Sequence, residues 1–171
     1  MFDRAFKDWG VMFGIEASAE GAQVRVLEFS EQVLARIVGS GVLVHTIAEG
    51  ESSGPIMFVF PNDFIGAAIE SALMIPATDS PSASEEDDSH VETAQELMNL
   101  FCCSATAALE ETHHRLRISQ SVDDLHVSFK AEAPTQNLEK SSLVCVNVGV
   151  KSGERSGRAW CLVSAAVASA L

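Results

Sequence analysis

The sequence is short of basic residues, of long apolar runs and of paired cysteines, and each shortage excludes a class of protein. Only 11 Lys and Arg stand against 24 Asp and Glu, which gives a formal net charge of -13. Because this charge repels phosphates, nucleic acid and anionic membranes are excluded as partners. No window approaches the roughly 20 apolar residues of a transmembrane helix, and residues 1–9 lack the apolar segment of a signal peptide.

The cysteine pattern gives no sign of a disulfide framework, because Cys102, Cys103, Cys145 and Cys161 lack paired spacing. We therefore expect a reduced, cytoplasmic protein. No glycine-rich loop precedes a helical pattern and no Ser-His-Asp order stands out, so neither phosphate-loop nor serine-hydrolase chemistry is indicated. The 171 residues, 47% of them apolar, predict a single domain over 1–171 with a substantial core.

One segment of the chain has the composition of a linker. Residues 76–89, PATDSPSASEEDDS, combine two prolines and four serines with an acidic run. A solvated connection is the favoured interpretation, and a docking site for a basic partner is the alternative. The segment separates two halves of the chain, about 1–75 and 90–171.

The two halves repeat each other at an offset of 103 residues. A Gly-x-x-x-Gly motif followed by an apolar run occurs twice, beginning at Gly50 and at Gly153. The agreement of turns and strands predicts an internal duplication rather than a solenoid, which needs short repeats. The motif glycines are expected in hairpin turns, where a positive φ is required.

Each half has the pattern of a strand, a hairpin and a helix. Alternation and turn signals predict strands at 23–29, 41–48, 56–60, 116–119, 125–129, 143–150 and 159–163. Helices are predicted at 3–13, at 31–38, at 62–74 with Asn62 and Asp63 as the cap, at 90–114, and after Ser164. Within 3–13, the spacing of Phe6, Trp9 and Phe13 predicts a buried stripe. The expected fold is α+β: a pseudo-two-fold duplicated antiparallel sheet with long helices packed on it.

The longest helical pattern, from His90 to His114, has an apolar face and a polar face. At ~100° per residue, one face collects Ala94, Leu97, Met98, Phe101, Ala105, Ala108, Leu109 and Thr112. The opposite face collects Glu92, Glu96, Asn99, Cys103, Thr106 and Glu110. Glu96 and Asn99 are three residues apart and are therefore neighbours on the outer face. From spacing alone, the plain interpretation is a solvated surface.

Cys102 and Cys103, together with His113 and His114, are the residues of the sequence that suggest a metal site. Adjacent cysteines on one helix point about 100° apart, so they do not chelate one ion easily. A buried cysteine and two histidines that end a helix are the favoured interpretation. We therefore expect no metal site.

The wider segment 96–109, ELMNLFCCSATAAL, resembles the signature helix of the CheC/CheX/FliY family of bacterial chemotaxis phosphatases, which carry an E-x-x-N motif. The stretch 57–61, MFVFP, is also similar to the middle domain of the flagellar switch protein FliM, a fold relative. The family has Asp or Ser four residues before the glutamate, where this chain has Glu92. It also has a proline where this chain has Ser-Val-Asp at 121–123.

The resemblance implies hydrolysis of the aspartyl phosphate on a CheY-type receiver domain in chemotaxis or flagellar signalling. Glu96 and Asn99 would be the catalytic residues: Asn99 orients the attacking water, and Glu96 pairs with a receiver lysine. Glu92, Cys103 and Thr106 are the expected partner-binding residues. The receiver supplies its own Mg²⁺, so no cofactor is expected on this chain.

The partner implied by the resemblance is a phosphorylated CheY-like receiver, with a flagellar switch component or a CheD-like protein as further candidates. The alternative function is a non-catalytic adaptor, similar to the FliM middle domain, that binds without hydrolysis. Because the offset maps Met1 onto Ser104, only one motif helix and one site are expected.

Overall fold

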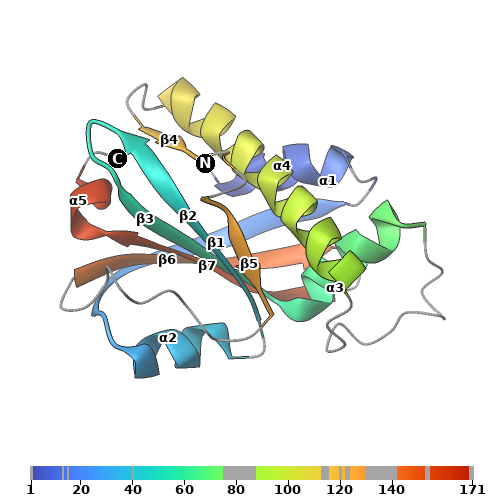
Figure 1. Ribbon diagram of the computed structural model, residues 1–171, viewed down its shortest axis with the longest axis horizontal. Helices are drawn as coiled ribbons and strands as arrows, with labels where there is room; N and C mark the ends of the chain where they lie inside the picture. Colours follow the sequence, from blue (N-terminus) through green and yellow to red (C-terminus); the bar gives the residue numbers. More distant parts are fainter. Residues whose placement is uncertain are drawn as a thin grey trace.

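A computed structural model describes residues 2–12, 14, 16–39, 41–74, 88–112, 116–119, 121, 124–129, 142–152 and 155–169. Its elements, shown in Figure 1, are α1 (Phe2–Met12), β1 (Ala17–Glu28), α2 (Glu31–Val38), β2 (Val42–Gly50), β3 (Gly54–Phe60), α3 (Asn62–Ala72), α4 (Asp88–Thr112), β4 (Leu116–Ile118), β5 (His126–Ser128), β6 (Ser142–Ser152), β7 (Arg155–Ser164) and α5 (Ala165–Ala168). None of these helices combines the length and apolar character needed to cross a membrane.

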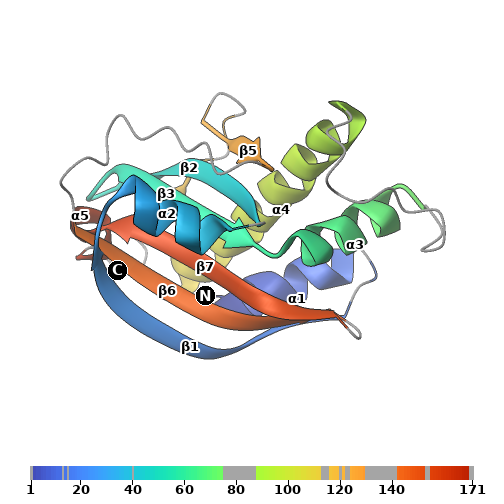
Figure 2. The ribbon, with the colours of Figure 1, turned by 90° about the horizontal axis from the view of Figure 1, so that it is seen from below.

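The seven strands form one antiparallel sheet in the order β1-β6-β7-β3-β2-β4, with β5 also paired to β2. Side chains of α1, α3, α4 and α5 pack into a large core on one face of the sheet. Helix α2 covers the other face with a smaller core around Leu34 and Val38 (Figure 2). The expected α+β class, with helices packed on an antiparallel sheet, is confirmed.

Helix α4 buries the apolar stripe that its sequence predicts. Seven residues of this stripe are at most 3% exposed: Ala94, Leu97, Met98, Phe101, Ala105, Ala108 and Leu109. The side chain of Thr112 is not among those that the structure describes. The ring of Phe101 lies 5.1–5.4 Å from the rings of Phe6, Phe58 and Phe60. Burial of such side chains contributes about 1.5–3 kcal/mol each. This stripe fixes the rotation of α4, and therefore determines which residues point outward.

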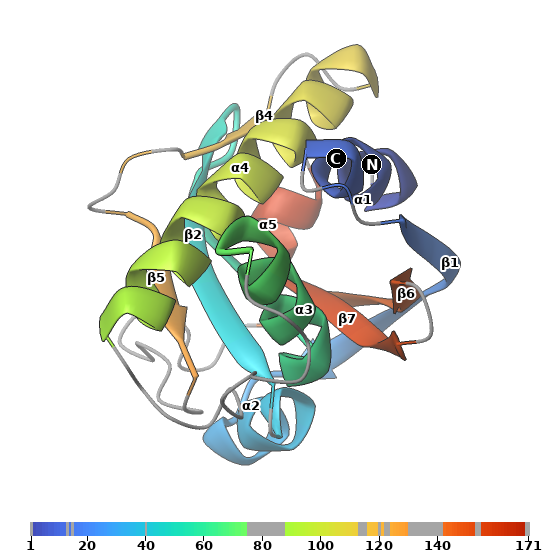
Figure 3. The ribbon, with the colours of Figure 1, turned by 90° about the vertical axis from the view of Figure 1, so that its right-hand side faces the viewer.

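Helix α1 confirms the predicted N-terminal helix and runs antiparallel beside α4 (Figure 3). Phe6 and Trp9 are buried as expected, and Phe13 falls outside the described residues. The indole Nε1 of Trp9 donates to the Leu97 carbonyl at 2.9 Å. At the opposite end of the contact between the two helices, Arg4 of α1 forms an ion pair with Glu111 of α4. Both contacts hold α4 in place from the side.

The strand registers support the predicted duplication. At the centre of the sheet Phe58 of β3 pairs with Cys161 of β7, and these two residues are 103 positions apart. On the two outer sides, β6 pairs with β1 in the same sense as β2 pairs with β5. In the predicted repeat, the position of the long strand β1 corresponds in the second half to two short strands, β4 and β5. The division into repeats 1–75 and 90–171 stays a prediction, and most of the linker 76–89 lies outside the described residues.

Two local predictions about α3 are wrong. The residue before its first turn is Pro61, which makes no side-chain cap hydrogen bond, so Asn62 and Asp63 do not cap the helix from in front of it. The helix also ends at Ala72 rather than at Met74, where the backbone turns to a φ of 54°. A helix cannot continue through such a left-handed residue.

The prediction that the motif glycines lie in hairpin turns holds for Gly50 and is wrong for Gly157. Gly50 has the expected positive φ of 145°. Gly157, however, lies within β7 opposite Val150 rather than in the turn. A Cβ atom at Gly157 would lie 2.5 Å from Cγ of Pro61, so close packing, not turn geometry, requires glycine there.

Candidate functional site

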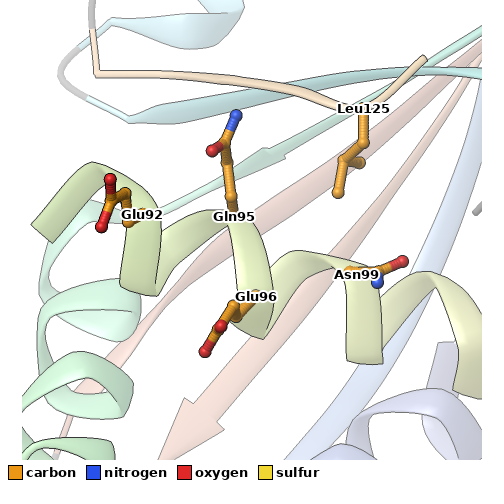
Figure 4. Close-up of a pocket in the computed structure, with 5 residues that line it drawn as sticks. All are labelled: Glu92, Gln95, Glu96, Asn99 and Leu125. Carbon is orange, nitrogen blue, oxygen red and sulfur yellow. The ribbon is translucent and has the colours of Figure 1, made fainter. Parts of the chain in front are cut away.

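The outer face of α4 borders an open hollow of about 300 Å³ that is lined by Glu92, Gln95, Glu96, Asn99 and Leu125. Four of these residues come from two successive turns of α4. Leu125 immediately precedes β5 and approaches the helix from the side (Figure 4). The hollow therefore contains both predicted catalytic residues and one of the predicted partner-binding residues, Glu92.

The apolar stripe of α4 turns the two motif residues outward. Glu96 is exposed and Asn99 is half-buried, one helical turn apart. Figure 4 shows the Glu96 carboxylate on the side of α4 away from Leu125 and Gln95. A partner that approaches this face therefore meets a carboxylate and an amide at a fixed spacing. Their catalytic roles stay predictions.

The amide oxygen of Asn99 is buried and has no hydrogen-bond partner among the described residues. Buried polar atoms in folded proteins are nearly always paired, and an unpaired one costs about 1–3 kcal/mol. In the structure as described, the amide oxygen thus has no donor within the described residues and no access to solvent. A rotation of about 180° around the Cβ–Cγ bond of Asn99 would exchange the positions of its amide oxygen and nitrogen.

Cys103 lies one turn beyond Asn99 and is half-buried. Burial raises the pKa of its thiol, so the thiol stays protonated at neutral pH. Burial of the adjacent Cys102 raises the pKa of that thiol to about 12. A protonated thiol is a poor nucleophile, so the geometry does not favour covalent catalysis by cysteine. All four cysteines are free.

Thr106 was expected on the outer face with the other polar residues, and this placement is wrong. The residue is only 7% exposed. Its Oγ1 accepts from the backbone N–H of Ile118 at 3.1 Å, and donates to the carbonyl oxygen of the same residue at 3.4 Å. Strand β4 crosses α4 at this turn, so Thr106 fastens the strand to the helix.

A second hollow, of about 500 Å³, follows the first one along α4. It is lined by Glu49, Cys103, Thr106, Ala107, Glu110, Arg117, Ile118 and Ser119. Arg117 of β4 pairs with Glu110 of α4 at 3.2 Å. Cys103 and Thr106 therefore line the second hollow and not the first, Thr106 from its buried position.

Two lining residues of the first hollow were not identified from the sequence. Gln95 lies three residues after Glu92 and four before Asn99, so helical spacing alone could have included it. Leu125, which is 4% exposed, follows Asn99 by 26 positions and carried no recognisable signal.

The described residues contain no group of three or more His, Cys, Asp and Glu side chains that could hold a metal ion. His113 and His114, the two histidines of the metal site considered from the sequence, lie outside the described residues.

No protein-family model matches the sequence, and no curated protein does. Solved structures do match. FliY from Thermotoga maritima has a TM-score of 0.75 and 18% identity, with 99% of this chain and 87% of that chain covered. The chemotaxis protein CheX from Desulfovibrio desulfuricans has a TM-score of 0.55 and 15% identity, with 94% of each chain covered.

The FliM middle domain from H. pylori has a TM-score of 0.68 and 8% identity, with 98% of this chain and 90% of that chain covered. FliM from the same organism has also been solved in complexes with FliG and with SpeE. Likeness at these identities establishes the fold. The chain therefore has the CheC-like fold that FliY, CheX and the FliM middle domain share, which is the fold that its Glu-x-x-Asn helix implied.

Proposed function

We propose that this protein is a CheC-like phosphatase of chemotaxis or flagellar signalling, which promotes hydrolysis of the aspartyl phosphate on a CheY-type receiver domain. The observation that carries the proposal is the arrangement of Glu96 and Asn99. Both line one open hollow on α4, and the Asn99 amide oxygen has no hydrogen-bond partner in the described part of the chain. The proposal joins this geometry to the resemblance of the motif helix.

Asn99 would act by positioning water. Its amide oxygen accepts a hydrogen bond from one O–H of a water molecule and so turns the water lone pair toward the phosphorus. Phosphoryl transfer requires in-line placement of the attacking oxygen and stabilisation of charge, and little covalent chemistry. A single amide on a rigid helix supplies this placement. The Mg²⁺ that stabilises the phosphoryl charge belongs to the receiver in this proposal.

Glu96 would determine how the receiver docks. Its exposed carboxylate lies one turn from Asn99 and can pair with a lysine of the receiver. Glu92 lies one turn earlier along the same hollow, so a cationic group meets two carboxylates in succession. The negative net charge of the whole chain would further favour a partner with a basic docking surface.

A non-catalytic adaptor is the second candidate function, and the likeness to FliM favours it. FliM of H. pylori forms complexes with FliG and with SpeE, and neither name indicates a receiver. In an adaptor, the hollow on α4 would still bind a partner. An adaptor does not require the unpaired amide oxygen of Asn99, so the adaptor function leaves this feature unexplained. We therefore rank the adaptor second.

The test is phosphate release from a panel of CheY-type receivers phosphorylated with acetyl phosphate. The full chain should accelerate release, and Asn99→Ala should reduce this acceleration by about 100-fold or more, because the water loses its orientation. Receiver binding should be little changed, so the loss should appear in the hydrolysis step. Gln32→Ala is the matched control, because Gln32 is an exposed amide on α2, across the sheet.

A charge reversal separates docking from chemistry. Glu96→Lys should weaken receiver binding, and added salt should restore part of it, because the effect is repulsion between like charges. Glu28→Lys, at the exposed end of the edge strand β1, makes the same charge change and should leave receiver binding unchanged. Receivers that bind with no accelerated release would identify an adaptor and refute the phosphatase. Full activity in Asn99→Ala would refute the role of that residue.

A further inference from the structure

Three arginines of this acidic chain have no carboxylate partner among the described residues. The chain has 24 Asp and Glu against 11 Lys and Arg, and ion pairs between described residues involve Arg4, Lys7, Arg117, Lys151 and Arg155. Arg25, Arg36 and Arg158 form no such pair within the described part of the chain. Arg36 lies on α2, and the other two lie on strands β1 and β7, on the face that α2 covers. The unpaired arginines that the structure describes are therefore on one side of the sheet.

Arg25 and Arg158 lie on either side of strand β6, on the face beside α2 (Figure 2). Arg25 of β1 is directly opposite Cys145 of β6, which belongs to the small core beneath α2. Trp160 of β7 is directly opposite Asn147, two residues further along β6. Because alternate residues of a strand share a face, Arg158, two residues before Trp160, points to the same side. This face therefore carries two guanidinium groups, an indole and an amide.

A buried amide holds the guanidinium group of Arg158. The Nη1 nitrogen of Arg158 donates to Oδ1 of Asn147 at 2.8 Å. Asn147 is only 4% exposed, whereas Arg158 is exposed. An arginine that is already oriented loses less side-chain freedom when a partner binds, so more of its interaction energy contributes to affinity. Asn147 therefore presents Arg158 to a partner in a preset orientation.

The positions of the two arginines suit an extended acidic peptide. The guanidinium group of Arg158 is held at Asn147. Arg25 lies opposite the residue two positions earlier on β6, a distance of about 7 Å along the strand. Burial raises the pKa of the Cys145 thiol and the charge of Arg25 opposes this rise, which agrees with a guanidinium group close to Cys145. Alternate side chains of an extended peptide also repeat at about 7 Å, so two carboxylates at alternate positions can meet both arginines.

The side chains around the two arginines favour a protein as the partner. Trp160 is half-buried and packs against the small core beneath α2, so part of its indole is open beside the arginines. Trp and Arg are enriched among the residues that carry most of the binding energy in protein interfaces. Glu20 and Arg158 lie opposite the same residue of β6 from its two sides, but Glu20 pairs with Lys151 at 3.7 Å. It therefore does not neutralise Arg158.

We propose that Arg25, Asn147, Arg158 and Trp160 form a surface, which we call the arginine face, that binds an extended acidic segment of a partner protein with Asp or Glu at alternate positions. Each carboxylate accepts charge-assisted hydrogen bonds from one guanidinium group, and the indole contacts the apolar part of the segment. Because the net charge of the chain is -13, most of its surface repels such a segment, and the arginine face attracts it. The inference does not depend on the proposed phosphatase function.

The test is the fluorescence anisotropy of a labelled peptide of alternating glutamate and serine, titrated with the full chain at low salt. The peptide should bind, and a peptide of alternating glutamine and serine should not. Added salt should weaken binding, because exposed charges are screened. Arg25→Gln and Arg158→Gln should each weaken it by about fivefold or more, since each removes a charged hydrogen-bond donor. Both variants should fold, because both side chains are exposed.

Asn147→Asp tests the orientation of Arg158 without removing the arginine. The new carboxylate would pair with the guanidinium group within the chain, so peptide affinity should fall about as far as in Arg158→Gln. Arg117→Gln is the matched control. It removes an exposed positive charge beside α4, away from the arginine face, and should leave peptide affinity unchanged.

Equal peptide affinity of the parent chain and the two arginine variants would overturn the proposal. An equal loss in Arg117→Gln, or no peptide binding up to about 1 mM, would overturn it as well. Inorganic phosphate that displaces the peptide at equal concentration would assign the arginine face to a small anion. Self-association of the parent chain that disappears in Arg25→Gln would assign it to a second copy. Either result would refute the assignment to an acidic segment of another protein.

Discussion

Replacing Asn99 with alanine should stabilise the protein at the same time as it removes activity. The variant eliminates a buried amide oxygen that has no partner in the described residues, a defect that costs about 1–3 kcal/mol. Alanine is also the better helix former, by about 0.5 kcal/mol in the interior of α4. The small void left by a half-buried side chain offsets part of this gain. The expected net stabilisation is about 1 kcal/mol.

Thermal unfolding measures this change directly. For a chain of this length, about 1 kcal/mol corresponds to a rise of roughly 2–4 °C in the midpoint. Gln95→Ala is the control, because Gln95 lines the same hollow but contributes no orphaned buried atom. Its midpoint should shift by less than the equivalent of about 0.5 kcal/mol. A fall of several degrees in Asn99→Ala would show that the amide is bonded in solution, and would refute the reasoning.

Three further predictions concern the framework of the site. Trp9→Ala should destabilise the protein by about 3–5 kcal/mol in chemical denaturation, because it empties a buried indole site between α1 and α4. Gly157→Ala should cost about 1–3 kcal/mol through collision with Pro61, whereas Gly149→Ala, whose Cβ atom finds its nearest neighbour at 3.4 Å, should cost less. His45→Gln should reduce acid sensitivity. Burial, with the charge of His126, lowers the pKa of His45, so the unfolded chain binds the proton more readily and stability falls as pH drops through about 6.5. An unchanged pH profile of the unfolding midpoint in this variant would contradict that assignment.

The long helix and its buried stripe were predictable because a period of 3.6 residues sustained over 25 residues is a strong signal. The start of β1 was not predictable from the sequence. The strand begins at Ala17, but its register shifts between Glu20 and Gln23, and Gly21 has a φ of 65°. Such a bulge interrupts the alternation on which strand prediction depends. The pattern was therefore recognised only from residue 23 onward.

Alternation in β1 also gave a misleading view of burial. Val24 and Val26 alternate with polar residues, which normally indicates one buried face, yet they are 65% and 70% exposed. They lie on an edge strand, and no helix buries these two side chains. Sequence period identifies a strand and its two faces. It does not tell which strand will lie at the edge.

Some features of the site follow from local sequence, and others depend on segments that are far apart in the sequence. The neighbouring positions of Glu96 and Asn99 follow from helical geometry, and their significance came from a motif. The burial of Thr106 depends on β4 crossing the helix, and the approach of Leu125 depends on the pairing of β5 with β2. Both contacts join segments whose mutual positions are set by the whole sheet, so no local pattern could reveal them.

The edge of the sheet beyond β2 consists of two short strands, β4 and β5, and this affects how the first hollow can change shape when a partner binds. One wall is part of a 25-residue helix with a continuous buried stripe. The other wall begins where a three-residue strand starts, held to β2 by three residue pairs. Local opening of β5 therefore costs far less free energy than local opening of α4. A partner that pushes against Leu125 widens the hollow at the edge of the sheet, while Glu96 and Asn99 keep their spacing.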